Sequence, residues 1–278
     1  MALPRPAIVA ALALTLFAAG CGEVSTDQPG IAPGSSTVTS HEPADPPATV
    51  GEAATWQLQQ PEFVNPHAQG LMVEVTRLGC SGGETGEVLE PQVAYDNDRI
   101  IIRTDVAPLT GDTYTCQGND AVPVEIQLEQ SIGGRDLVDA ACLEGEAVTT
   151  ADCTDAVRWT SPSRGATSEI PDWEPPADYS FVVTSGCGER AFIGRFAVTV
   201  TAGAVSAVEP IGESYAGVTA EMTPTLSDML DEARAAAEQG TVEVAVDDAG
   251  VPRWIDIDPI PNAIDDESCY AISDYRQL

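Results

Sequence analysis

Hydrophobic and polar positions change pattern several times along the chain, and each pattern predicts a different kind of structure. The first pattern is a continuous apolar run over residues 7–19. This run is shorter than the roughly 20 residues that cross a bilayer, so it fits the core of a signal peptide better than a membrane span. Residues 22–50 are rich in glycine, proline, serine and threonine. Because such a segment buries too little apolar surface to fold, we predict a flexible tether over residues 21–50.

Residues 51–165 carry short strand patterns and no helical period. Three β-branched runs bounded by turn residues lie at residues 71–75, 99–103 and 122–128, and the last of them alternates with period two. Asp96, Asn97 and Asp98 supply a turn between two runs. Strands at this spacing predict a small β-sandwich domain of immunoglobulin-like size, with its topology left open.

Residues 161–178 contain several prolines and indicate a linker, which we place at 166–178 between two domains. Beyond it, strand patterns recur in a second domain, residues 179–278, and Ala202-Gly203 is typical of a hairpin turn. The expected strands lie at residues 179–183, 195–200, 204–208, 241–246, 254–257 and 270–273.

One amphipathic helix interrupts these strands. Thr225 can cap it, with Asp228 three residues later, and Gly240 ends it. Its apolar face consists of Leu226, Met229, Leu230, Ala233 and Ala237. The order βββαβββ predicts an α+β domain, an antiparallel sheet with one helix on a face.

The apolar run ends in Leu16-Phe-Ala-Ala-Gly-Cys21, with small residues before the cysteine and a polar, acidic segment after it. This arrangement resembles the lipobox of bacterial lipoprotein signal peptides. The resemblance implies a signal peptide over residues 1–20, a diacylglyceryl group on Cys21, and attachment to the extracytoplasmic face of the cell membrane. Two acyl chains are enough for stable anchoring. Simple secretion is the alternative.

Six cysteines remain once Cys21 is set aside. An even number without a Cys-x-x-Cys pair indicates structural disulfides formed in an oxidising compartment. Six cysteines allow fifteen pairings, and the domain division favours Cys80–Cys116, Cys142–Cys153 and Cys187–Cys269. A zinc site is the weaker alternative because His41 and His67, the two histidines, precede all six cysteines.

The chain is strongly acidic, with 44 acidic residues, 12 basic residues and a net charge of −32. All the basic residues are arginine. Nucleic-acid binding requires basic residues that neutralise phosphates, so the charge excludes it. Anionic membrane surfaces repel such a chain, which leaves the lipid on Cys21 as its membrane contact. The charge chiefly favours solubility, and a cationic protein partner or a divalent cation is the sharper interpretation.

Several short motifs recur together in the second half of the chain. They are Tyr179-Ser-Phe, Cys187-Gly-Glu-Arg, Val198-Thr-Val before Gly203, residues 250–258, and Asp265-Asp-Glu before Tyr270 and Ile272. In this order, residues 172–278 resemble an uncharacterised domain found in lipoproteins of GC-rich Gram-positive bacteria. The resemblance implies a lipoprotein context and a small α+β domain, and it carries no known activity. Some members have two cysteines after the first strand, whereas Cys187 stands alone here, which leaves Cys269 as its partner.

Acidic residues near the C-terminus are the candidate metal ligands: Asp256, Asp258, Asp265, Asp266 and Glu267. As a calcium loop starting at Asp256, the segment fails at Ile260 and at Pro261, where a glycine is needed. A looser calcium site remains an alternative. We favour solvent-facing Asp256 and Asp258 on one side of a strand, with the Asp-Asp-Glu group at a turn.

No catalytic constellation stands out. Residues 212–217 miss the spacing of a serine nucleophile elbow. His67 is the one histidine outside the tether, and we interpret it as an exposed loop residue without a partner. The aromatic residues are expected mainly in cores, including Trp254, while Trp173 in the linker is expected at the interface between the domains. The other aromatic candidates are Trp159, Tyr179, Tyr270 and Tyr275.

The sequence therefore predicts a membrane-tethered, non-enzymatic binding or interaction module, with no cofactor and an unknown ligand. Two alternatives remain. One is a carboxylate-dependent hydrolase of the cell envelope, which requires a cleft that gathers at least two carboxylates with divergent protonation. The other is a surface spacer or inhibitor protein.

Overall fold

The computed structural model describes residues 44–111, 114–188, 192–212, 214–261 and 263–278. These residues fall in one compact unit that is mostly β, with two sheets and a single α-helix in the C-terminal region. The predicted signal peptide, Cys21 and His41 lie outside the described residues. In the part of the chain that is described, no helix has the length and apolar character that a membrane crossing requires.

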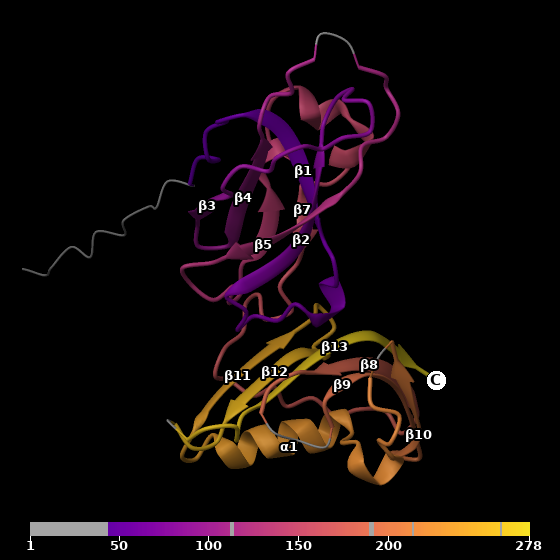
Figure 1. Ribbon diagram of the computed structural model, residues 1–278. Helices are drawn as coiled ribbons and strands as arrows, with labels where there is room; N and C mark the ends of the chain where they lie inside the picture. The colour runs from indigo at the N-terminus through magenta and orange to yellow at the C-terminus, as the bar shows by residue number, and fades with distance from the viewer. Residues whose placement is uncertain (1–43, 112–113, 189–191, 213, 262) are drawn as a thin grey trace, which may run out of the picture. The chain divides into compact units, whose positions relative to one another are not determined.

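The first sheet contains seven strands in the order β5-β2-β1-β4-β6-β7, with β3 also paired to β4 (Figure 1). Their bounds are β1 Glu52–Leu58, β2 Gly70–Arg77, β3 Gln92–Tyr95, β4 Arg99–Val106, β5 Val122–Gln127, β6 Asp136–Asp139 and β7 Val157–Trp159. The three strands and the turn expected at 96–98 are confirmed. The immunoglobulin-like sandwich is not confirmed, because the strands form one hydrogen-bonded path and β4 pairs with β6 in parallel.

Strand β4 lies at the centre of this sheet. Ile100, Ile101 and Ile102 pair with both β3 and β6, so neighbouring strands cover both edges of β4. Ile100 and Ile102 belong to the core of this sheet, and Ile101 on the opposite face is also 0% exposed. Both faces of β4 are therefore covered, which explains a continuous buried apolar run instead of an alternating one. Trp56 of β1 is 0% exposed and its indole N–H donates to the Ile102 carbonyl at 3.2 Å.

Short connections complete this half of the chain. They contain four 3-10 helices: η1 Pro61–Phe63, η2 Ala140–Cys142, η3 Glu146–Thr149 and η4 Ala151–Cys153. Disulfides join Cys80 to Cys116 and Cys142 to Cys153, the pairings that the domain division favours. Residues 44–50 contact the first sheet: for example, Ala44 N donates to Asp96 and Arg103 Nε to the Pro47 carbonyl. The end of the predicted tether is therefore held against the sheet.

The second sheet is a six-stranded antiparallel sheet in the order β10-β9-β8-β13-β12-β11, with α1 (Leu226–Ala236) across one face (Figure 1). Its strands are β8 Tyr179–Ser185, β9 Gly194–Thr201, β10 Ala204–Ile211, β11 Thr241–Val246, β12 Pro252–Asp258 and β13 Ser268–Gln277, and η5 (Ala220–Met222) precedes the helix. All six expected strands, the hairpin turn at Ala202-Gly203 and the order βββαβββ are present. A third disulfide joins Cys187 to Cys269.

The helix starts at the predicted capping box, in which Thr225 and Asp228 exchange hydrogen bonds. Leu226, Met229, Leu230 and Ala233 are buried against the sheet. The expected fifth member of this face, Ala237, is exposed, and Ala236 packs against the core instead, because the helix ends at Ala236. Gly240 then turns the chain where a Cβ atom would lie 2.1 Å from the Asp258 carbonyl oxygen.

Aromatic residues fill this core. Tyr179 and Tyr270 are buried, as is Trp254 on the other face of the sheet. The expectation that Trp173 lies between two domains is wrong: it packs edge-on against Tyr275, at the core beneath the second sheet.

Candidate functional site

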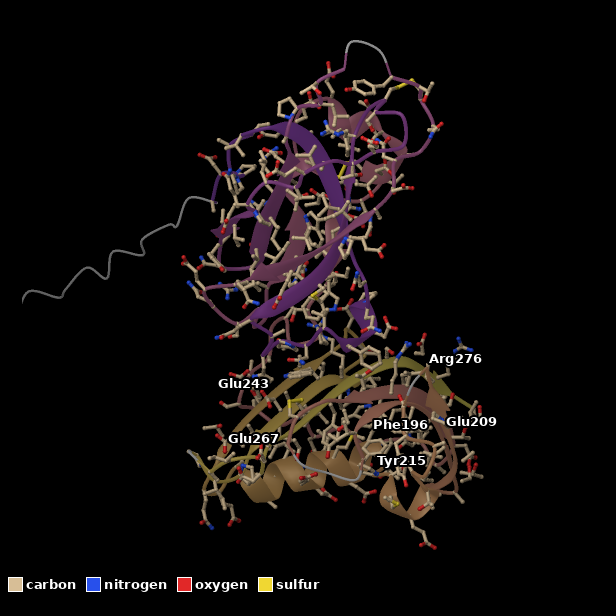
Figure 2. The ribbon with its side chains drawn as sticks, viewed as in Figure 1. Phe196, Glu209, Tyr215, Glu243, Glu267 and Arg276 are labelled. Atoms are coloured by element: carbon tan, nitrogen blue, oxygen red, sulfur yellow. A yellow bond between two sulfur atoms is a disulfide. The ribbon has the colours of Figure 1, made fainter. Side chains whose placement is uncertain are left out.

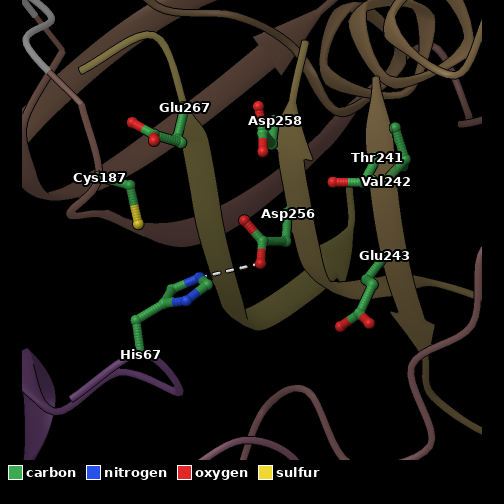
Figure 3. Close-up of a pocket in the computed structure, with 8 residues that line it drawn as sticks. All are labelled: His67, Cys187, Thr241, Val242, Glu243, Asp256, Asp258 and Glu267. Atoms are coloured by element: carbon green, nitrogen blue, oxygen red, sulfur yellow. Dashed lines mark ion pairs between the residues drawn. The ribbon is translucent and has the colours of Figure 1, made fainter. Parts of the chain in front are cut away.

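A pocket of about 640 Å³ lies on the face of the second sheet that is opposite the helix. This volume is within the range of small-molecule sites. Figure 3 shows its side chains, which come from the adjacent strands β11 and β12, from segments next to the ends of β8 and β13, and from the loop that carries His67. The lining residues are His67, Cys187, Thr241, Val242, Glu243, Asp256, Asp258 and Glu267.

Strand alternation places the carboxylates on this face. Ile255 and Ile257 of β12 belong to the core under the helix, so Asp256 and Asp258 point the opposite way. On the neighbouring strand, Glu243 is the register partner of Asp256. Residues directly opposite each other have Cβ atoms about 5 Å apart, and two like charges in such a pair destabilise a sheet. The sheet therefore carries an unfavourable acidic pair where it borders the pocket.

His67 reaches this acidic pair from the loop between η1 and β2. The Asn65 side chain accepts a hydrogen bond from the His67 backbone N–H at 2.9 Å and fixes the turn. The imidazole Nε2 lies 2.9 Å from Asp256 Oδ2, and the ring centroid is 6.0 Å from that of Trp254. The His67 side chain is 53% exposed and that of Asp256 is 18% exposed.

The surroundings of His67 favour its charged form. The hydrogen bond to Asp256 raises the pKa of His67 above its ordinary value of 6.5, although partial burial opposes the shift. The negative charges of Asp256, Glu243 and Glu267 raise the pKa further.

A second cavity of about 380 Å³ adjoins the same histidine. It shares His67, Glu243 and Asp256 with the first pocket and is otherwise lined mainly by small residues. Trp254 also lines it and is 1% exposed. The indole N–H of Trp254 has no acceptor among the residues that the structure describes. Buried donors of this kind normally have a partner.

The Cys187–Cys269 disulfide borders the first pocket. Gly188 follows with φ at +71°, and a Cβ atom there would lie 2.3 Å from the Glu267 carbonyl oxygen. Only glycine fits this position, so the chain after Cys187 packs directly on the backbone of Glu267. The disulfide and this contact hold one wall of the pocket.

A model of a protein family matches the C-terminal part of the chain. Residues 172–277 match the model of a family of unknown function, DUF6174. The match confirms the resemblance to an uncharacterised domain and spans all of β8–β13 and α1. Comparisons with curated proteins and with solved structures give no match. The pocket carboxylates therefore lie within the DUF6174 region, whereas His67 precedes it.

The acidic candidates from the sequence separate into two groups in the DUF6174 region. Asp256, Asp258 and Glu267 line the pocket, whereas Asp265 and Asp266 are outside its lining. We expected Asp256 and Asp258 to face solvent. They form part of the pocket wall beside His67 instead. Across the described ranges, no three His, Cys, Asp or Glu side chains are close enough to share a metal ion.

The sequence did not reveal the part that two residues, His67 and Glu243, play in this site. The interpretation of His67 as a histidine without a partner is wrong, because its partner Asp256 lies in a distant segment of the chain. Glu243 has a local signal, since Val242 and Val244 alternate with it in a strand and are buried. That alternation predicts its face but not its neighbour, because strand register is a property of the folded sheet.

Proposed function

We propose that this chain is an extracytoplasmic binding module, anchored through lipid on Cys21, whose acidic pocket binds the cationic group of a ligand. The facing pair Glu243 and Asp256 is the observation that carries the proposal. Like charges across two strands weaken a sheet, and a bound cation would remove that repulsion. A site that gains stability from its ligand in this way favours the liganded state.

An organic cation suits the site better than a metal ion. Calcium requires six to eight oxygens at about 2.3–2.6 Å, which means that the ligands converge on one point. The acidic side chains of the described residues form no such cluster. They are spread around a pocket of about 640 Å³ instead. A guanidinium group presents five N–H donors in a planar fork, so it can bridge carboxylates that are further apart.

The adjoining cavity adds a second feature of the ligand. The unpaired indole N–H of Trp254 requires an acceptor. A ligand that carries both a cationic group and an oxygen acceptor could bind the carboxylates of the first pocket and accept a hydrogen bond from the indole N–H of Trp254. An arginine or lysine side chain with its own backbone carbonyl has this chemistry, which suggests a basic peptide or protein segment as the natural partner.

Calorimetric titration with N-acetylarginine amide tests the proposal. The matched neutral compound, N-acetylcitrulline amide, has nearly the same shape and lacks the charge. We expect binding of the arginine compound and at least about tenfold weaker binding of the citrulline compound, since hydrogen bonds between charged groups contribute about 1.5–3 kcal/mol. Equal affinities, or no binding of either compound, would contradict the proposal.

Two substitutions provide the protein control. Glu243→Gln removes a pocket charge and is expected to weaken binding of the arginine compound by about tenfold. Glu209→Gln removes one charge from β10 at the other edge of the sheet, outside the pocket (Figure 2). This second variant has the same net charge as Glu243→Gln and is expected to bind like the wild type.

The lipid anchor has a separate test. Cells that express the chain are grown with an alkyne-bearing fatty acid, and the wild type should be labelled. The Cys21→Ala variant should carry no label and should leave the membrane fraction. Equal labelling of both proteins would refute the anchor and leave the pocket proposal intact.

We also propose that the two sheets are separate domains, an all-β domain at residues 51–165 and an α+β domain at 179–278. Each sheet has its own hydrogen-bonded path and its own hydrophobic core cluster, which supports this division.

The hydrolase alternative would use the same site. His67 and Asp256 resemble a base and its orienting carboxylate. Cys187, whose sulfur borders the pocket, is bonded to Cys269 and offers no thiolate. Release of products from envelope polymers by the wild type, and its loss in His67→Gln, would favour this alternative over binding alone.

A further inference from the structure

We infer that the acidic pocket exchanges the proton of His67 for the cationic group of its ligand, so that ligand binding releases a proton. This inference rests on the proposed binding function and adds its regulation. It follows from the position of His67, which holds the same carboxylate that the ligand would need.

Asp256 is the carboxylate that both His67 and the ligand cation would bind. Its Oδ2 lies 2.9 Å from His67 Nε2, and the carboxylate is largely covered by its surroundings. Glu243 is its register partner on the neighbouring strand. A protonated imidazole therefore already supplies the positive charge that relieves the repulsion between Asp256 and Glu243. A ligand cation that enters this pair replaces that charge.

The charged groups that face His67 from the described walls of the pocket are all acidic. Glu243 comes from β11, Asp256 and Asp258 from β12, and Glu267 from the segment just before β13. The part of the second cavity that the first half of the chain and the linker form is uncharged; its residues are Pro66, Ser131, Gly133, Gly134, Ser163, Gly165 and Ala166. Among the described residues that line either cavity, the protonated His67 thus carries the only positive charge.

Two cations in one small pocket repel each other. A bound guanidinium or ammonium group close to His67 would therefore favour the neutral imidazole. The exchange is balanced, because the protonated protein and the cationic ligand give the complex and one free proton. The charge inside the pocket stays the same. The imidazole is 53% exposed, so it can pass its proton to solvent without a further relay group.

The exchange predicts how affinity depends on pH. The hydrogen bond to Asp256, together with the nearby negative charges, raises the pKa of His67 above its ordinary value of 6.5. At a pH below that raised pKa, ligand binding must displace the proton of His67. At a pH above it, His67 is already neutral and no proton has to be released. Affinity for N-acetylarginine amide should therefore rise with pH, by up to about tenfold per pH unit, and should level off above the pKa of His67 in the free protein.

Calorimetry in two buffers with different ionisation enthalpies measures the proton directly. At a pH below the raised pKa of His67, we expect release of close to one proton per bound N-acetylarginine amide. His67→Gln cannot be protonated and should bind the same compound without proton release and with a flat pH profile. Near-ultraviolet circular dichroism establishes that this variant remains folded.

Proton NMR adds a readout at the residue itself. The chain has two histidines, so the ring signals of His67 and His41 can be told apart with the His67→Gln spectrum. Saturating ligand should lower the pKa of His67 and leave that of His41 unchanged. Binding with no proton release and an unchanged His67 titration would overturn the exchange while leaving the binding function in place. No binding of the probe at any pH would overturn both.

Discussion

Asp139 illustrates at the scale of a single residue how this acidic chain holds buried charge. The residue is 0% exposed, ends β6 and caps η2. It accepts hydrogen bonds from Thr55 Oγ1 at 2.6 Å, from the backbone N–H groups of Trp56 and Ala141, and from Arg158 Nη2 at 2.8 Å. These four donors, one of which is the charged guanidinium group of Arg158, replace the water that the carboxylate loses on folding.

Asp139→Ala should strongly destabilise the protein. The Arg158 side chain is only 6% exposed and would lose its charged partner, and removing one member of a buried ion pair costs about 3–5 kcal/mol. The measurement is the free energy of unfolding in urea at neutral pH. Asp231→Asn breaks the exposed pair with Arg234 and serves as the control, with an expected change below about 1 kcal/mol. Similar effects of the two substitutions would contradict this account of Asp139.

The helix α1 shows what local sequence can determine at the scale of an element. Thr225 accepts a hydrogen bond from the Asp228 backbone N–H at 3.1 Å, and the Asp228 side chain accepts one from the Thr225 N–H at 2.9 Å. Both contacts lie within four residues, so no tertiary information is required to predict them. The strands at 241–246 and 179–183 are equally local, since their alternation has period two.

Thr225→Ala should lower the free energy of unfolding by about 1 kcal/mol, because the first turn of α1 loses its cap. Thr225→Ser is the matched variant, since it also loses the methyl group but keeps the hydroxyl. We expect the serine protein to be clearly more stable than the alanine protein in parallel urea titrations. Equal stability of the two variants would mean that the hydroxyl does not cap the helix.

Other elements gave no readable pattern. Strands β6 and β7 have four and three residues, which is too short for any periodicity to emerge. Strand β1 contains Ala53 and Ala54, and alanine is depleted in strands. Strands β1 and β6 pair with β4, and β7 pairs with β6, so tertiary pairing decides these strands.

The ion pair of His67 with Asp256 matters for the whole molecule because it joins a loop of the first sheet to β12 of the second. Its contribution to stability depends on pH. Because the folded-state pKa of His67 is raised above 6.5, the pair stabilises the folded state fully below that value. The contribution is then lost as the pH rises through the folded-state pKa.

Wild type and His67→Gln should therefore differ most in their free energy of unfolding below about pH 6. The difference should be no more than about 1 kcal/mol, since His67 is half-exposed and solvent screens the pair. Above the folded-state pKa the two denaturation curves should converge. A constant difference at all pH values would show that His67 contributes through packing alone.

The sequence alone determined the features that depend on neighbours along the chain or on composition. These are the strands of the second sheet, the capped helix, the acidic charge and the even set of cysteines, whose three disulfides are present as predicted. Only the tertiary structure decided the pocket. The C-terminal strand β13 inserts between β8 and β12, and register then sets Asp256 beside Glu243. His67 reaches them from the first half of the chain. Periodicity specifies which face of a strand a side chain occupies, but the partner across the strand is fixed only when the sheet assembles.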